Sequence, residues 1–265
     1  MADAKEQATG LCDIHCHILP GIDDGADSLE TSLAMCRLAV ADGIRTIVAT
    51  PHFNDRFQPD DATVDAALEL LRAAAAREGL PLEILPGADV APHMRLKELT
   101  ANGRLTIARQ GKYMLLEPPR QSMPDWLDEV IFDVRVNGIG VILTHPERNL
   151  EVQRNPNTIV RLVQSGVMVQ ITADSIVGTF GPEAERCAIS LLKMNAAHFI
   201  ATDAHSADHR APCIWDALQK ASKYAGDYAM TMACENPRAV VNGELITVPE
   251  PQPLRSWFGG IINSA

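Results

Sequence analysis

The sequence has no apolar run long enough to cross a bilayer, for which a helix needs about 20 apolar residues. Residues 1–10 also lack the apolar core of a secretory signal peptide. Basic residues are in the minority, with 23 Lys and Arg against 34 Asp and Glu, and the formal net charge is −11. Because nucleic-acid backbones bind to clusters of Lys and Arg, which are missing here, no nucleic-acid partner is expected. We therefore expect a cytoplasmic protein with no membrane span.

The six cysteines form neither a disulfide framework nor a Cys-x-x-Cys pair, and we expect them to be reduced and mostly buried. None of them is followed six positions later by arginine, the spacing that a cysteine-dependent tyrosine phosphatase requires. The sequence also lacks the Gly-x-Ser-x-Gly elbow of serine hydrolases and the glycine pattern of a phosphate-binding loop. These absences leave metal-assisted hydrolysis as the chemistry that the sequence favours.

Apolar strand-like runs alternate with helix-like segments along the chain, an order typical of a parallel sheet. The best-marked helix is predicted from Ser28 to Asp42, where Asp27 and Glu30 have the spacing of a capping box. A second helix is predicted from Ala62 to Glu78. The length of 265 residues is usual for a single β/α barrel domain. The seven predicted strands lie at about residues 11–16, 44–50, 82–87, 112–117, 139–144, 167–172 and 198–202.

Histidines and carboxylates follow the carboxyl ends of these strands, where the active sites of β/α barrels are built. Residues 11–18 read LCDIHCHI, and strand alternation would place Asp13, His15 and His17 on one face and Cys16 on the other. His198 precedes a strand, and we interpret it as a core residue. The pattern therefore predicts a site for several metal ions. Its other candidate ligands are His52, Asp89, Glu117, His145, Asp203 and His205.

These residues resemble the polymerase and histidinol phosphatase (PHP) superfamily, and within it the manganese-dependent tyrosine phosphatases of bacterial capsule and exopolysaccharide operons. The resemblance rests on DIHCHILPGIDDG, GIRTIVATPHF, GAD, LLEPP, LTHPERN, ATDAHS with Arg210, and NPRAVV, over residues 11–242. It implies an α/β fold, a distorted seven-stranded TIM-like barrel that forms a single domain over residues 11–245. Residues 1–10 would be a flexible tail and residues 246–265 a C-terminal tail that packs on the barrel or on a partner subunit.

The resemblance also implies three divalent metal ions. Mixed imidazole and carboxylate ligands favour Mn²⁺, with Fe²⁺ or Zn²⁺ as alternatives. Asp23 could exchange roles with Asp24, because the sequence does not fix which side chain faces inward. Asp89 would bridge the first and second of these ions. Most members of the family have glutamate at this position, so Asp89 is a departure from the family pattern. The first ion would be held by His15, His17, Asp89 and Asp203, the second by Asp89, Glu117 and His145, and the third by Asp24, His52 and His205.

By the same resemblance, Arg148 and Arg210 would bind the substrate phosphate, although a surface salt bridge is the alternative for each. Asp13 and Glu147 are interpreted as groups that orient the ligand histidines. The implied reaction is hydrolysis of phosphotyrosine by a metal-bound hydroxide, with a bacterial tyrosine kinase as the protein partner.

Two other functions stay open on the sequence. One is a phosphoesterase that acts on a small phosphate monoester such as histidinol phosphate. The other is a non-catalytic metal-binding module of the polysaccharide machinery, against which the complete set of nine candidate ligands argues. The sequence does not identify the physiological substrate, and a homo-oligomer is possible.

Overall fold

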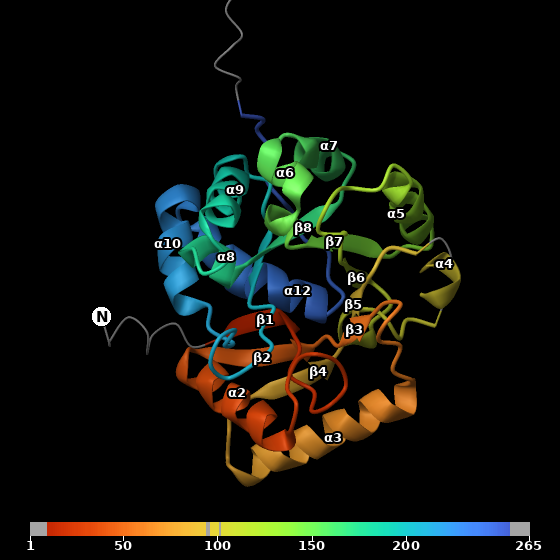
Figure 1. Ribbon diagram of the computed structural model, residues 1–265, viewed down its shortest axis with the longest axis vertical. Coiled ribbons are helices and arrows are strands. Elements are labelled where there is room, and N and C mark those ends of the chain that lie inside the picture. Colours follow the sequence, from red (N-terminus) through yellow and green to blue (C-terminus); the bar gives the residue numbers. More distant parts are fainter. Residues whose placement is uncertain (1–9, 94–95, 101, 255–265) are drawn as a thin grey trace, which may run out of the picture.

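The computed structural model describes residues 10–93, 96–100 and 102–254. These residues form two parallel β-sheets with helices packed around them (Figure 1). The three-stranded sheet has the order β1 (Leu11–Cys16), β2 (Ile44–Ala49) and β4 (Glu83–Pro86). The six-stranded sheet has the order β3 (His52–Phe53), β5 (Asp89–Val90), β6 (Tyr113–Leu116), β7 (Gly140–Thr144), β8 (Met168–Thr172) and β9 (Phe199–Ala201).

The seven predicted strands are all found, as β1, β2, β4, β6, β7, β8 and β9, and every boundary agrees within one residue. Most helices lie around the sheets, while the helix at Asn236–Val241 lies across the middle of the view, and α2 (Leu29–Ala41) and α3 (Asp61–Arg77) pack together beside the three-stranded sheet (Figure 1). The helices are α2 (Leu29–Ala41), α3 (Asp61–Arg77), α4 (Leu96–Leu99), α5 (Leu127–Val136), α6 (Leu150–Arg154), α7 (Thr158–Gln164), α8 (Ala173–Val177), α9 (Pro182–Lys193), α10 (Trp215–Ala225), α11 (Tyr228–Met230) and α12 (Asn236–Val241). Short turns of other helix types are η1 (Ile107–Arg109), η2 (Pro146–Arg148) and η3 (Thr231–Glu235).

The cap of α2 lies one residue later than predicted. Ser28 is the N-cap, and its side chain accepts a hydrogen bond from Thr31 N at 3.2 Å. Asp27 instead accepts from the Thr31 hydroxyl at 2.6 Å. The capping box that we predicted from Asp27 and Glu30 is therefore wrong: with Ser28 as the cap, the backbone donor bound is Thr31 N, whereas a cap at Asp27 would have bound Glu30 N.

Two short strands that the sequence did not reveal, β3 and β5, follow β2 and β4 in the chain but belong to the other sheet. Pro51 precedes β3 and has no N–H to donate to a ladder. Gly87 lies between β4 and β5, where an added Cβ would be 2.6 Å from Val48 Cγ1. β3 and β5 pair with each other, His52 opposite Asp89, and continue into the six-stranded sheet. The described residues therefore form two sheets and not the single closed seven-stranded sheet that we predicted.

β1 and β9 belong to different sheets but come together at their carboxyl ends. Cys16 and Ala204 form an isolated parallel bridge. Asp203 N donates to His15 O at 2.8 Å, and His17 N donates to Ala204 O at the same distance. The carboxyl ends of both sheets therefore meet at one place, where the candidate ligands lie.

The alternation predicted for β1 is interrupted. The ladder with β2 shifts register between Asp13 and Cys16, and such an irregularity changes which residues share a face. Cys12 and Ile14 accordingly pack in the smaller hydrophobic core cluster, whereas Cys16 packs in the larger one. Cys16 is still kept away from the candidate ligand groups, as predicted. Four of the six cysteines are buried and none of the six forms a disulfide, which confirms the expectation for this residue type.

The C-terminal segment after α12 packs on the protein as far as it is described. Ile246 and Val248 contact the smaller core cluster, and Gln252 N donates to Met194 O at 2.6 Å. Residues 1–9 and 255–265 of the predicted tails lie outside the described residues. Within the described part of the chain, no helix combines the length and apolarity that a membrane crossing requires.

His198 is a core residue, as predicted. Its side chain is fully buried, and Nδ1 accepts a hydrogen bond from Val169 N at 2.9 Å. Among the described residues Nε2 has no hydrogen-bond partner. Burial lowers the pKa of His198 to about 4.

This buried imidazole makes stability depend on pH. The pKa of a histidine in the unfolded chain is about 6.5. Below about pH 6.5 the unfolded state therefore binds a proton at His198, whereas the folded state does not until the pH falls to its lower pKa. The stability present above about pH 6.5 is then lost progressively until the folded pKa is reached. Between pH 7 and pH 5 we expect the wild type to lose about 2 kcal/mol relative to His198→Asn, whose amide oxygen can still accept from Val169 N but does not titrate. Urea unfolding of both proteins at both pH values measures this, and equal pH slopes would contradict the prediction.

Candidate metal centre

The structure brings all nine candidate ligands together at the carboxyl ends of the strands. They come from β1, β3 and β5 and from the loops that follow β1, β6, β7 and β9. Their ligand atoms form four groups, and within each group the atoms lie within 4.8 Å of one another. The groups are His17, Asp24, His52 and His205; His15, His17 and Asp89; His15, His145 and Asp203; and His52, Asp89 and Glu117.

The groups overlap but do not coincide with the three sets that the resemblance implied. His52 lies between two of them, because Nε2 is 3.5 Å from Asp24 and Nδ1 is 3.2 Å from Asp89. His145 belongs to the group with Asp203, although its Nε2 is also 3.7 Å from Glu117 Oε1. The side chains therefore form one continuous cluster.

The two imidazoles of β1 converge, as the sequence predicts. The Nε2 atoms of His15 and His17 are 3.2 Å apart, and Asp203 Oδ1 lies 3.5 and 3.4 Å from them. The opposite ring nitrogens are held by polar partners: His15 Nδ1 is 2.9 Å from Gln170 Oε1, and His17 Nδ1 is 2.6 Å from Asp23 Oδ2. These partners fix the ring orientations and leave both Nε2 atoms facing the cluster.

The contacts of Asp23 separate it from Asp24. Asp23 accepts hydrogen bonds from the backbone N–H groups of His52 and Gly25 at 2.9 Å, in addition to its contact with His17. Asp24 carries the group that faces the cluster, 3.6 Å from His205 Nε2. Of these two neighbours, Asp24 is therefore the one placed among the candidate ligands.

Asp13 binds the backbone of the ligand His15 and not its ring, whereas Glu147 has no side-chain hydrogen bond to a ligand histidine among the described residues. Asp13 accepts from Thr202 N at 3.0 Å and from His15 N at 3.2 Å, and so joins β1 to the end of β9. Glu147 accepts from Thr172 N at 3.0 Å. Both are buried, and burial raises the pKa of each to about 6. Two ring-orienting residues were missed: Gln170, a polar side chain within the buried run of β8, and Asp23, which we considered only as an alternative to Asp24.

Two buried polar atoms in the cluster have no hydrogen-bond partner among the described residues, His52 Nδ1 and Asp89 Oδ2. Buried polar atoms are normally satisfied, and an ion between them is one of the arrangements that satisfies such a pair. The donors are imidazole nitrogens and carboxylate oxygens, which suit divalent transition metals. The residues therefore fit the metal ions that the resemblance implied.

The electrostatics of the cluster also suit cation binding. Burial alone would raise the pKa of Asp203, but His15 and His17 outweigh it and hold the pKa well below its usual range. Burial, followed by the charge of Asp89, raises the pKa of Glu117 to about 7. Burial lowers the pKa of His145 to about 3, so this imidazole is neutral near pH 7 and can coordinate. The pKa values of His15, His17 and His52 are raised, and a cation held here would replace the protons that these three histidines share with the carboxylates.

Two candidate ligands have left-handed backbone conformations, which non-glycine residues rarely adopt. His145 has φ 33° and Asp203 has φ 51°. Both are held by backbone hydrogen bonds of 2.8 Å, from His145 N to Gln170 O and from Asp203 N to His15 O. Such strain persists where the surrounding structure over-determines it, and it clusters at functional sites.

Arg148 and Arg210 reach the cluster from neighbouring loops. Arg148 Nη1 and Arg210 Nη2 each donate to Asp203 Oδ2 at 2.5 Å. Asp203 therefore presents one oxygen to the imidazoles and the other to both arginines. Neither arginine therefore forms its salt bridge on the surface away from the site, because the partner of both is Asp203.

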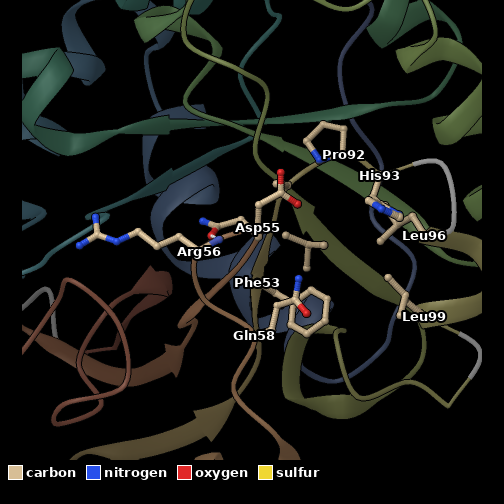
Figure 2. Close-up of a pocket in the computed structure, with 11 residues that line it drawn as sticks. Phe53, Asp55, Arg56, Gln58, Pro92, His93, Leu96 and Leu99 are labelled. Carbon is tan, nitrogen blue, oxygen red and sulfur yellow. Dashed lines mark hydrogen bonds between the residues drawn. The ribbon is translucent and has the colours of Figure 1, made fainter.

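A cavity of about 610 Å³ lies on the loops that follow β3 and β5. Its wall includes Phe53 and Val90, which directly follow the candidate ligands His52 and Asp89 in the chain. Apolar side chains of α4 line another part of the wall, and polar side chains of the loop after β3 lie at the rim (Figure 2). None of the nine candidate ligands lines this cavity. A second cavity, of about 700 Å³, is lined by Asp24, His205 and Arg210 and therefore opens on the candidate metal centre.

Asp89 has a shorter side chain than the glutamate that is usual in the family, and this difference leads to a prediction about metal affinity. Its carboxylate already lies 3.2 Å from His52 Nδ1 and 3.6 Å from His15 Nε2, so the backbone has adapted to aspartate. A glutamate side chain at position 89 would be about 1.5 Å longer, and residue 89 is fully buried. We expect Asp89→Glu to weaken Mn²⁺ binding by roughly tenfold, because overpacking costs about 1 to 3 kcal/mol. Calorimetric titration of Mn²⁺ into the metal-free wild type and variant tests this, and tighter binding by the variant would contradict it.

Comparison with known proteins identifies relatives over most of the chain. The family described as "Capsular polysaccharide synthesis, CpsB/CapC" matches residues 11–242. The tyrosine-protein phosphatase YwqE of Bacillus subtilis is 35% identical over 252 residues, which are 94% of this chain and 99% of that protein. The putative tyrosine-protein phosphatase CapC of Staphylococcus aureus is 29% identical over 254 residues, with the same coverage of 94% and 99%.

The comparison with solved structures finds the same group of relatives. One from the crystal structures of YwqE and of CpsB from Streptococcus pneumoniae, described as unique metal-dependent tyrosine phosphatases, has a TM-score of 0.88 and 33% identity over 93% of this chain and 100% of that one. The phosphotriesterase homology protein of Escherichia coli has a TM-score of 0.56 at 12% identity, over 88% of this chain and 99% of that one, which shows a TIM-barrel-like fold alone. With the family matched over residues 11–242, this chain belongs to the CpsB/CapC family of capsular polysaccharide synthesis proteins.

Proposed function

We propose that this protein is a metal-dependent protein-tyrosine phosphatase that hydrolyses phosphotyrosine and regulates capsule or exopolysaccharide synthesis. The observation that carries the proposal is Asp203, whose carboxylate joins the histidine cluster to Arg148 and Arg210. Two arginines beside a metal centre are the pattern of a phosphate-binding site. The full-length similarity to YwqE supports the same activity.

The proposed cofactors are three divalent metal ions, with Mn²⁺ favoured over Fe²⁺ and Zn²⁺. Three such ions would bring six positive charges, and the four carboxylates of the cluster return four negative ones. The surplus of two matches a phosphate monoester dianion, so an acidic protein can hold an anion here. When bound, the ions lower the pKa of a coordinated water and neutralise phosphoryl oxygens. The proposed ligands are His15, His17, Asp24, His52, Asp89, Glu117, His145, Asp203 and His205.

The other side chains bind and orient the phosphate. Arg148 and Arg210 offer N–H donors to its oxygens, and Asp203 holds both guanidinium groups at the edge of the cluster. The phenol of tyrosine is a manageable leaving group, because its pKa is about 10. The buried thiols are poor candidate nucleophiles: burial raises the pKa of Cys36 to about 12, for example, and removes the thiolate near neutral pH.

A protein substrate is favoured over a small metabolite by the space beside the site. The cavity of about 700 Å³ that Asp24, His205 and Arg210 line can receive the chain that flanks a phosphotyrosine. We propose a phosphotyrosine protein, such as a bacterial tyrosine kinase, as the partner. A phosphoesterase for a compound like histidinol phosphate would use the same metal ligands and arginines, so the substrate has to be tested directly.

The test compares a phosphotyrosine peptide, a phosphoserine peptide of the same sequence and histidinol phosphate, with one Mn²⁺-loaded preparation. We expect kcat/KM to be highest for the phosphotyrosine peptide. A higher value for histidinol phosphate would reassign the protein to small-molecule hydrolysis. No hydrolysis of any of the three, with the metal bound, would identify a non-catalytic metal-binding module.

A further inference from the structure

Phe180 lies against both arginines of the site. The ring centroid is 4.5 Å from Arg148 Cζ and 5.6 Å from Arg210 Cζ, and both guanidinium groups donate to Asp203. A guanidinium close to the face of an aromatic ring is attracted by the quadrupole of the ring. Each arginine therefore has two partners, one aromatic face and one carboxylate oxygen.

The loop that carries Phe180 has a defined shape. Gly178 and Gly181 flank it with φ 95° and φ 92°, a region in which side chains other than glycine are strained. Thr179 N donates to Asp174 O at 2.9 Å and closes the end of α8. Gly181 N donates to Gly178 O at 3.0 Å, directly before α9. The turn between α8 and α9 therefore fixes the backbone on both sides of Phe180.

The aromatic contact matters because the arginines leave donors uncommitted. Arg210 Nε is buried without a hydrogen-bond partner among the described residues, whereas Arg210 Nη2 donates to Asp203 O at 2.8 Å and to Oδ2. A guanidinium has five N–H groups, and those that do not contact Asp203 are available to an anion. Long arginine stems otherwise sample many rotamers, and ordering them on binding weakens affinity.

We propose that Phe180 is a positioning residue that holds Arg148 and Arg210 in the orientation in which they bind phosphate. This rests on the proposed function, in which the two arginines contact the phosphoryl group. The ring acts through the two arginines. Removal of the aromatic face would release both stems, so phosphate binding would weaken while the metal stays in place.

The experiment measures the dissociation constant of inorganic phosphate for the Mn²⁺-loaded protein, together with kcat, KM and metal content. We expect Phe180→Leu to weaken phosphate binding roughly fivefold to thirtyfold, to raise KM more than it lowers kcat, and to leave metal content unchanged. Phe180→Trp keeps an aromatic face and should restore most of the affinity. The control is Phe132→Leu on α5, the same change at a side chain that is 66% exposed.

A double-mutant cycle makes the test specific. If Phe180 acts through Arg148, then Phe180→Leu should have a smaller effect on phosphate binding in an Arg148→Ala background. Wild-type phosphate affinity in Phe180→Leu would overturn the proposal, and so would loss of metal from this variant, because the ring would then support the ligands. Phosphate titration does not depend on turnover, so a failure of the proposed phosphatase function would show as missing peptide hydrolysis with the phosphate result unaffected.

Discussion

Asp203→Ala should reduce phosphatase activity by at least roughly a thousandfold, the largest effect that we expect from any single substitution. Asp203 is the carboxylate with contacts on both sides of the site: Oδ1 lies 3.5 Å from His15 Nε2, and Oδ2 accepts from both arginines. Its removal takes away a candidate metal ligand and leaves two cationic groups without their shared anion. His52→Ala, which removes a ligand shared by two groups, should have a comparable effect.

These variants are compared with the wild type by steady-state kinetics on a phosphotyrosine peptide and by elemental analysis. We expect close to three divalent ions per wild-type chain, fewer in each variant, and loss of activity on treatment with EDTA. The cysteine variants Cys213→Ser and Cys234→Ser, at the two thiols that are not fully buried, are the controls and should turn over at nearly the wild-type rate. A folded but inactive cysteine variant, or full activity in metal-free protein, would refute a metal-dependent mechanism.

Arg148→Ala and Arg210→Ala should each lower kcat/KM by roughly tenfold to a hundredfold, because a hydrogen bond to a charged group contributes about 1.5 to 3 kcal/mol. Metal content should stay at the wild-type value, since neither arginine is a ligand. The lysine variants keep the charge but lose the planar fork, so their activity should lie between alanine and wild type. The measurement is kcat/KM on the peptide together with the affinity for inorganic phosphate. An arginine whose alanine variant keeps wild-type constants has a structural role only.

The sequence alone determined where the candidate ligands would meet. The strands around His15, His145 and Asp203 could be predicted because each is a short apolar run, and parallel strands bring their carboxyl ends to one edge. The residue types that follow those strands then indicated metal chemistry, and the cysteine spacing excluded a thiol nucleophile. All of these features are local, since each depends on neighbours within a few positions.

The tertiary structure decided what depends on residues far apart in the sequence. Asp23 and Asp24 are adjacent and chemically identical, and only the position of His17 and of the His52 backbone separates their roles. Gln170 contacts the ring of His15, although the two residues are 155 positions apart in the sequence. Phe180 meets both arginines only because the turn after α8 faces the ends of β7 and β9, and no periodicity or motif encodes that approach. The division into two sheets likewise follows from the pairing of β3 with β5, two strands too short to give a pattern, whose partners are chosen by contacts and not by local preference.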